Sequence, residues 1–248
     1  MRHLLAVGPL PWKALGVNPG DWRDCEIHEA SSESDALRRL RVRAFDVVIT
    51  HPMTSADRDL PLVREAREQQ PGIRPIVIAP ELTPADIIAA MRSDVYACFT
   101  MPVTPADLRE TINDALDADD WKNGIHVLSA LPDWIALRVA CKRVTAERLT
   151  HFIAQLTTDV SEDGRFQLVT AFREVLLNAM EHGAGFDPDK VVEVAAIRTA
   201  RTIVYYFKDP GPGFNPKQLS GVATETDPIG HMAAREAKGQ RPGGQISR

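Results

Sequence analysis

Short apolar runs and longer amphipathic stretches alternate along the first half of the chain. Five runs have the length and apolar content of buried strands: 3–8, 25–30, 46–51, 75–80 and 96–101. Apolar residues recur at helical spacing in four other stretches: 32–43, 57–70, 83–94 and 104–117. Strands that alternate with helices are typical of α/β proteins. The pattern therefore predicts an α/β domain with a five-stranded parallel sheet at residues 1–117.

The pattern changes after a polar stretch at 118–123, which we interpret as a linker between domains. The elements predicted beyond it are strands at 124–130 and 134–141, helices at 145–157 and about 163–182, and strands at 190–199 and 201–209. Consecutive strands with helices segregated from them indicate an α+β sandwich with one covered sheet face. We therefore predict a second domain at residues 124–248.

Composition and charge exclude several classes of function. With 44% hydrophobic and 25% charged residues, the chain has the composition of a soluble globular protein, and its 248 residues provide enough apolar material for two cores. A net charge of −5 argues against a nucleic-acid partner, because neutralising phosphates needs a basic face. No apolar run reaches the ~20 residues that span a bilayer, so we expect no membrane partner. Three cysteines in no CxxC spacing favour buried thiols in a reducing cytoplasm.

Residues 1–117 resemble the response-regulator receiver family, whose fold is flavodoxin-like. The resemblance rests on segments that match that family's third strand, fourth strand, and fifth strand with the last helix: "FDVVITHP" (45–52), "RPIVIAP" (74–80) and "ACFTMPVTPADLRETI" (97–112). The chemistry of that family needs an acidic pair after the first strand, a phosphoacceptor aspartate at the end of the third, a serine or threonine after the fourth and a lysine after the fifth.

This chain departs from the receiver pattern at those positions. No acid follows the first strand, His51 stands at the phosphoacceptor position and Met101 at the lysine position. Without carboxylates there is no set of hard oxygen ligands for Mg²⁺. His51 is either a phosphohistidine or, as we favour, a strand-end histidine near the surface. We interpret Asp46, Asp57 and Asp59 as solvated loop or cap residues. We expect a pseudo-receiver used for docking or dimerisation.

In the second half, "AFREVLLNAMEHG" (171–183) places polar groups on a helix that otherwise has a buried pattern. Glu174 and Asn178 stand four residues apart and so share one helix face. Glu181 and His182 extend that face by a turn. The apolar stripe for the core is assigned to Leu168, Phe172, Val175, Leu176 and Ala179. Since unpaired polar groups are costly in a core, we expect the polar face to look into a cleft.

The segment "DPGPGF" (209–214) comes directly after a predicted strand. Asp209 can accept a hydrogen bond from an exocyclic amine, the group that adenine presents. Gly211 and Gly213 allow the backbone to turn tightly and to approach a ligand. Taken alone, such a segment is more often an ordinary turn.

A second glycine-rich segment, "KGQRPGGQ" (238–245), carries basic residues. Its backbone amides, together with Lys238 and Arg241, can cradle phosphates. Taken alone, it is equally often plain surface.

The three features, in this order and spacing, resemble the ATP-binding fold of the GHKL superfamily over about residues 124–248. Within that superfamily, "FREVLLNAMEHG" with "DPGPGF" is most similar to the anti-sigma regulatory serine kinases of the RsbW and SpoIIAB type. The resemblance implies a Bergerat-type two-layer α/β sandwich that binds ATP and Mg²⁺.

The resemblance also implies roles for matching positions. Asn178 would bind Mg²⁺ through its side-chain oxygen. Glu174 would act as general base or orient a serine hydroxyl of a partner protein, and Asp209 would recognise the adenine amino group. Gly183 belongs to the motif or is only a helix C-cap. Residues 219–244 would form a mobile lid over the phosphates. The remaining nucleotide-binding positions are His182, Gly211, Gly213, Lys238, Arg241, Gly243 and Gly244.

The end of the sequence departs from the GHKL pattern. The expected GGxG motif reads Gly243-Gly244-Gln245-Ile246, and the helix and strand that follow it in the family are not in this sequence. A truncated sandwich with weak nucleotide binding is therefore expected.

Three hypotheses on function follow. The first is an ATP-dependent anti-sigma-type serine/threonine protein kinase in bacterial partner-switching signalling, whose partner is a sigma factor or an anti-sigma antagonist. The second is a non-catalytic interaction protein that binds such partners through a dead receiver and a degenerate nucleotide domain. The third, a histidine-kinase or ATPase relative, is disfavoured because no dimerising phosphoacceptor helix pair precedes the nucleotide domain. Whether the protein forms a homodimer is left open.

Overall fold

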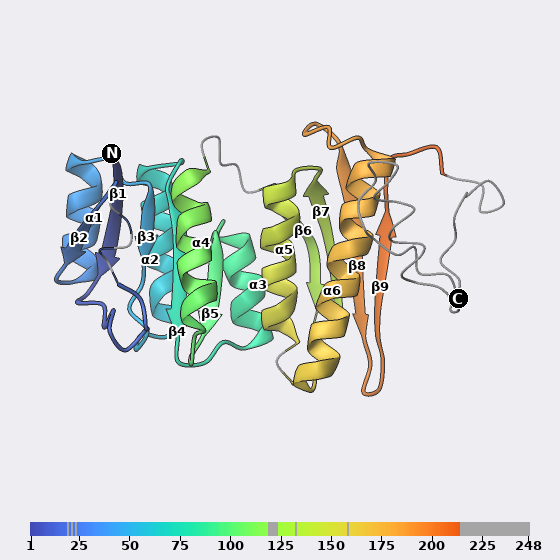
Figure 1. Cartoon of the computed structure of the whole chain (residues 1–248), viewed down its shortest axis with the longest axis horizontal. Helices are drawn as coiled ribbons and strands as arrows, with labels where there is room; N and C mark the ends of the chain where they lie inside the picture. Colours follow the sequence, from blue (N-terminus) through green and yellow to red (C-terminus); the bar gives the residue numbers. More distant parts are fainter. Residues whose placement is uncertain are drawn as a thin grey trace. The chain divides into compact units, whose positions relative to one another are not determined.

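The computed structural model describes residues 1–213, except for 19, 21, 23, 119–123, 132 and 158. Its first sheet is parallel, with the strand order β2-β1-β3-β4-β5 (Figure 1). The strands are β1 (Arg2–Val7), β2 (Cys25–Ala30), β3 (Val47–Ile49), β4 (Arg74–Ala79) and β5 (Ala97–Thr100). The helices are α1 (Glu33–Val42), α2 (Ala56–Gln69), α3 (Pro84–Arg92) and α4 (Pro105–Asp117). This is the flavodoxin-like strand order, so the predicted α/β fold is confirmed.

Both faces of the first sheet are covered, because successive residues of its strands point to opposite sides. Leu4 and Ala6 of β1 pack with α4, whereas Leu5 and Val7 pack with α1 and α2. The irregular segment between β1 and β2 covers the α4 side with apolar side chains: Leu10, Leu15, Val17 and Trp22. It stands where a doubly wound fold usually has its first crossover helix.

The helix starts follow from local capping chemistry. Thr83 precedes α3 and forms a capping box, in which its side chain accepts from the Asp86 amide and the Asp86 carboxylate accepts from the Thr83 amide at 2.9 Å. Pro84 occupies the first turn, where a missing N–H costs nothing. Ser161 likewise caps α6 by accepting from the Gly164 amide at 3.3 Å.

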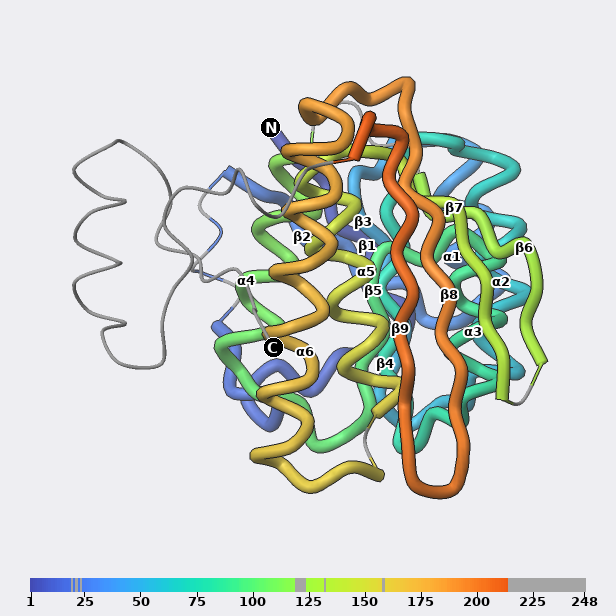
Figure 2. The backbone as a smooth tube through the Cα atoms, turned by 90° about the vertical axis from the view of Figure 1, so that its right-hand side faces the viewer, coloured from blue at the N-terminus to red at the C-terminus, as the bar shows by residue number. Residues whose placement is uncertain are grey.

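The second sheet is antiparallel, with the strand order β6-β7-β8-β9. Its strands are β6 (Ile125–Leu131), β7 (Trp134–Ala140), β8 (Val191–Arg198) and β9 (Ile203–Lys208). The helices α5 (Arg143–Leu156) and α6 (Glu162–Asn178) lie along one face of this sheet (Figure 2), and α6 continues into the π-helical turn η2 (Ala179–Gly183). The predicted sandwich of consecutive strands and segregated helices is confirmed.

The buried stripe of α6 differs from the predicted one. Phe172 and Leu176 are buried as predicted, but Val175 is 36% exposed. Leu177 and Met180 are buried instead. The stripe follows the i, i+4 row through Phe172, Leu176 and Met180, which leaves Val175 at its margin.

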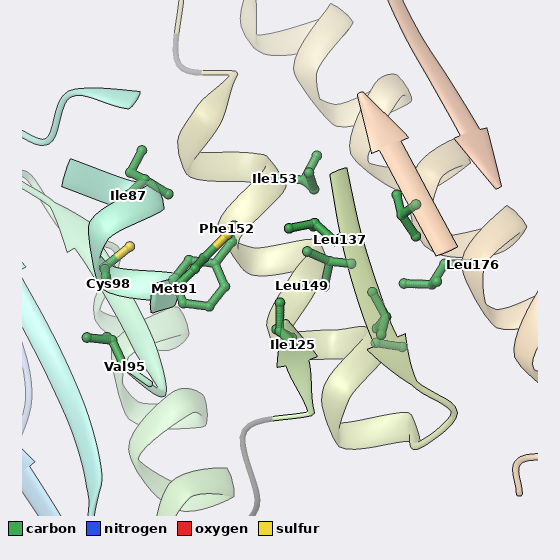
Figure 3. Packing of buried hydrophobic residues seen from close by; sticks show 14 of the residues in the cluster. Ile87, Met91, Val95, Cys98, Ile125, Leu137, Leu149, Phe152, Ile153 and Leu176 are labelled. Carbon is green, nitrogen blue, oxygen red and sulfur yellow. The ribbon is translucent and has the colours of Figure 1, made fainter. Parts of the chain in front are cut away.

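The two sheets share one hydrophobic cluster, which is built around α5 (Figure 3). The α5 side chains in the centre are Leu149, Phe152 and Ile153. Elements of the first sheet contribute Ile87, Met91, Val95 and Cys98, and elements of the second contribute Ile125, Leu137 and Leu176. Residues 1–209 accordingly form one compact unit. The domain limits at 117 and 124 stay a prediction.

Buried polar groups of α5 also bond to the backbone around the start of β5. Arg148 is 4% exposed, and it donates to the carbonyls of Val95 at 2.7 Å and Tyr96 at 3.0 Å. Nε2 of His151 lies 2.6 Å from the Cys98 carbonyl and must carry the proton, because a carbonyl only accepts. Burial lowers the pKa of His151, so the ring is neutral. These bonds fix α5 against the first sheet.

Three predicted burial states are wrong. Asp59 was interpreted as solvated, yet it is 2% exposed and accepts from Thr54 Oγ1 at 2.8 Å, because α2 turns it toward the loop after β3. Asp46 is partly buried because it accepts from the His3 amide at 2.7 Å. Cys25 lies on the edge strand β2 and is only half-buried, whereas the other two cysteines are buried as expected.

Replacing Asp59 by asparagine should change how stability depends on pH. Burial raises the pKa of Asp59 to about 6 despite hydrogen bonds from Thr54 and Thr50. A raised carboxyl pKa favours folding below the unfolded pKa, and this contribution is lost as pH rises toward 6. Between pH 4 and pH 7 the free energy of unfolding of the wild type should therefore fall by on the order of 2 to 3 kcal/mol relative to that of Asp59→Asn. Urea unfolding at both pH values measures this difference, with the exposed Asp57→Asn as control. If Asp59→Asn and Asp57→Asn depended on pH to the same extent, the raised pKa of Asp59 would be contradicted.

Candidate functional site

The predicted polar positions lie at the C-terminal end of α6. Glu174 and Asn178 stand one turn apart, and both are half-buried. The cation next to Glu174 is directed to another helix, since Arg173 donates to the Glu147 carboxylate of α5 at 2.8 and 2.5 Å. Glu174 and Asn178 therefore share one face of α6, as the helical spacing predicted.

The turn that follows Asn178 is π-helical rather than α-helical. Single π turns inserted at the end of an α-helix occur often at functional sites. In this turn Met180 is fully buried, Glu181 is half-buried and His182 is exposed. The wider turn shifts the residues after Asn178 around the helix axis, so they do not continue the regular face that the sequence predicted.

The π-helical turn ends at Gly183, and its C-cap residue is Ala184. Gly185 has φ of 67°, the left-handed conformation typical of helix C-termini, and its amide donates to the Glu181 carbonyl at 3.0 Å. The Phe186 amide donates to the Met180 carbonyl at 2.9 Å. The interpretation of Gly183 as a C-cap is therefore wrong, because the π turn includes Gly183 as its last residue and the left-handed glycine after the C-cap is Gly185.

Gly183 lies directly against Asp209, the residue that follows β9. A Cβ atom added to Gly183 would stand 2.5 Å from Asp209 Cβ and closer still to the carboxyl group. Real Cβ atoms do not approach other atoms this closely, so the position accepts no side chain. Asp209 itself is exposed. The structure thus brings together two motifs that are far apart in the sequence: the end of segment 171–183 and the start of segment 209–214.

The electrostatics at this end of the sheet involve the buried Cys141. Burial chiefly raises the pKa of its thiol, and the carboxylates of Asp187 and Asp209 add to the effect. The thiol is therefore protonated and serves as a small apolar side chain in the core.

The remaining predicted ligand residues are only partly within the described range. Gly213 has φ of 77°, a conformation that favours glycine and that fits the predicted tight turn. Gly211 is half-buried. The predicted lid at 219–244 and the phosphate-binding residues Lys238, Arg241, Gly243 and Gly244 lie outside the described residues.

In the receiver-like part, His51 follows β3 and is half-buried. Its Nδ1 accepts from the Met53 amide at 3.2 Å, and its ring lies beside Gly8, where an added Cβ would stand 3.2 Å from Cδ2. These contacts support a structural strand-end histidine. The phosphohistidine alternative stays a prediction.

Residues 138–243 match the family model described as "Histidine kinase-like ATPase domain". The matched range includes α5, α6, η2, β8, β9, the segment 209–214 and residues 238–243 of the second glycine-rich segment, and it covers less than half of the chain. No curated protein matches this chain.

Solved structures similar to this chain include receiver domains. A response regulator from Thermotoga maritima is 19% identical, with 48% of this chain and 99% of that chain covered and a TM-score of 0.41. A CheY-like receiver domain protein from Methanospirillum hungatei JF-1 is 19% identical, with 47% and 94% covered and a TM-score of 0.39. A receiver domain protein from Clostridium thermocellum is 24% identical, with 47% and 95% covered and a TM-score of 0.38.

The chain thus combines a flavodoxin-like fold with a region that matches the model of a histidine kinase-like ATPase domain. The strand order carries the first assignment and the family match carries the second. Among the described residues, no helix is both long enough and apolar enough to cross a membrane.

Proposed function

We propose that this protein is an ATP-binding regulator of bacterial signalling, an anti-sigma-type serine/threonine kinase that transfers the γ-phosphoryl group of ATP to a serine of a partner protein. The contact between Gly183 and Asp209 carries the proposal. It sets the acid expected to bind adenine beside the end of the helix that bears Glu174 and Asn178. The family match at 138–243 supports ATP as the ligand.

The described residues fit a nucleotide with Mg²⁺. Asn178 offers a carboxamide oxygen, a hard ligand of the kind that Mg²⁺ prefers. The Asp209 carboxylate is exposed and can accept from the adenine amine. Glu174, one turn before Asn178, is the candidate group to orient or deprotonate a serine hydroxyl. When bound, Mg²⁺ would screen the phosphate charge, and the protein residues would position the reacting groups.

The receiver-like part is proposed as a docking module rather than a phosphorylation switch. His51 and Met101 replace the groups that the receiver chemistry needs, while the fold is kept. We propose a sigma factor or its antagonist as the partner, with the cytoplasm as the compartment.

The second candidate is a non-catalytic platform that binds the same partners. It is favoured by Gln245 and Ile246, which follow Gly243-Gly244 where the family pattern ends in glycine. Such a platform would keep the protein contacts and would bind nucleotide weakly.

Titration of the full chain with a fluorescent ADP analogue and Mg²⁺ tests nucleotide binding. We expect saturable binding, and we expect Asn178→Ala and Asp209→Asn each to weaken it by about tenfold or more, because each removes a bond to a charged or polar group of the ligand. Asp187→Asn is the matched control, since Asp187 is also a carboxylate near Cys141 but has no proposed ligand role. If the wild type does not bind at millimolar nucleotide yet still captures its protein partner, the platform is favoured.

Glu174→Gln separates catalysis from binding. The variant should bind the ADP analogue as the wild type does and should fail to transfer phosphate from ATP to a serine of an antagonist protein. Mass spectrometry of the antagonist measures the transfer. If the wild type and Glu174→Gln transferred phosphate equally well, Glu174 would have no catalytic role.

A further inference from the structure

Three side chains that bind transition metals meet at the edge of the first sheet. His3 stands on β1, and Glu26 and His28 stand on the edge strand β2. Glu26 and His28 are two residues apart in a strand and therefore share one face. His3 pairs with Glu26 in the parallel register and so lies on the same face. The fold, and not the sequence spacing, assembles this His-Glu-His cluster.

The distances in the His-Glu-His cluster match those between ligands of one ion. His3 Nδ1 lies 3.4 Å from Glu26 Oε2, and His28 Nε2 lies 3.4 Å from Glu26 Oε1. All three ligand atoms lie within 4.8 Å of one another. Two ligands bound at about 2.0–2.1 Å in a tetrahedral zinc site are about 3.3–3.4 Å apart. The cluster therefore needs only small side-chain movements to close around an ion.

Both imidazoles present a suitable nitrogen. The Arg43 guanidinium lies 3.2 Å from His28 Nε2, and because arginine only donates, this nitrogen accepts and its lone pair faces Arg43. His3 Nδ1 is shielded from solvent and has no hydrogen-bond partner among the described residues. An unsatisfied buried nitrogen beside a carboxylate is the kind of group that an ion would satisfy.

The two imidazole rings pack against aromatic neighbours, whereas the nearest cation is a partly exposed arginine. The His28 ring packs edge-on against the buried Phe45 at 5.3 Å and lies 5.6 Å from the His3 ring. The Arg43 side chain is 44% exposed and also contacts Glu26 at 3.2 Å. Arg43 thus occupies the position of a cation and can swing into solvent when another cation replaces it.

We propose that His3 Nδ1, the Glu26 carboxylate and His28 Nε2 form a binding site for a divalent transition-metal ion of the Zn²⁺ class, in which the ion displaces Arg43. Two imidazoles and one carboxylate suit Zn²⁺ better than Mg²⁺, which prefers oxygen ligands. Three protein ligands leave a fourth position for water. The ion would tie the edge strand β2 to β1. The proposal does not depend on the nucleotide site.

Calorimetric titration of the full, tag-free chain with Zn²⁺ tests the site. We expect one ion per chain, and His3→Ala and His28→Ala should each weaken binding by more than about tenfold. Arg43→Ala should strengthen binding, because it removes the competing cation. His126→Ala, an exposed histidine on β6, should bind as the wild type does.

Thermal melting gives an independent readout, because a ligand that binds only the folded state raises the melting temperature. Zn²⁺ should stabilise the wild type and Arg43→Ala, and it should leave His28→Ala unchanged. If His3→Ala folds poorly, Glu26→Gln replaces it in both measurements. The site is refuted if the wild type takes up no Zn²⁺, or if it binds Zn²⁺ equally well after loss of His28 and Glu26.

Discussion

Replacing Arg148 by alanine should lower the free energy of unfolding by about 2–6 kcal/mol, a large share of the 5–15 kcal/mol that is typical of a folded domain. The guanidinium is buried in α5 and satisfies the carbonyls of Val95 and Tyr96. Although burial lowers its pKa to about 10, the group stays charged at neutral pH. Alanine would leave those carbonyls buried without their donor, and each such loss costs about 1–3 kcal/mol.

Urea unfolding followed by circular dichroism measures this effect. Arg173→Ala is the control, because Arg173 forms an exposed ion pair with Glu147 on the neighbouring helix and should cost less than about 1 kcal/mol. Arg148→Lys, which keeps a charge but fewer donors, should fall between the two. A loss for Arg148→Ala no greater than that for Arg173→Ala would mean that α5 is not anchored to β5 through this side chain.

The fold was predictable because most elements satisfy their own local rules. The apolar run at 75–80 predicted a strand of the parallel sheet, and β4 is buried along its whole length, as a strand covered on both faces should be. The joint packing of α5 was not predictable in the same way. The apolar stripe through Leu149 and Phe152 indicates that this face is buried, but it does not say which sheet will cover it. Only the assembled structure shows that α3 and β5 share this stripe with the second sheet.

The candidate nucleotide site also has features that the sequence predicted and features that only the structure shows. Helical spacing placed Asn178 and Glu174 on one face, the GHKL resemblance implied their roles, and the helix is where the sequence placed it. The π turn after Asn178 has no sequence signal, since each of its residues also tolerates an α-helix.

The His-Glu-His cluster was missed for a different reason. The alternation of Glu26 and His28 in one strand could have been noticed, but His3 joins them only through the register between β1 and β2.

Replacing Gly183 by alanine should weaken nucleotide binding strongly and should also destabilise the fold. The added methyl group would collide with the Cβ of Asp209 and not only with the end of a flexible side chain. Relief therefore requires the backbone of η2 or of the segment after β9 to shift. Overpacking of this kind costs about 1–3 kcal/mol. Because the shift moves Asp209, the acid proposed to bind adenine, affinity for the fluorescent ADP analogue should fall by more than about tenfold.

A second variant distinguishes lost packing from lost recognition at Asp209. In Gly183→Ala combined with Asp209→Gly, the colliding side chain is gone, so the packing loss caused by the added methyl group should disappear, while binding should stay lost because the carboxylate is missing. Gly72→Ala is the neutral control, since an added Cβ there meets nothing within 4 Å. Urea unfolding and nucleotide titration on the same four proteins separate the two effects. Wild-type affinity in Gly183→Ala would show that adenine is not recognised beside the helix end, and the proposed nucleotide site would then have to be abandoned.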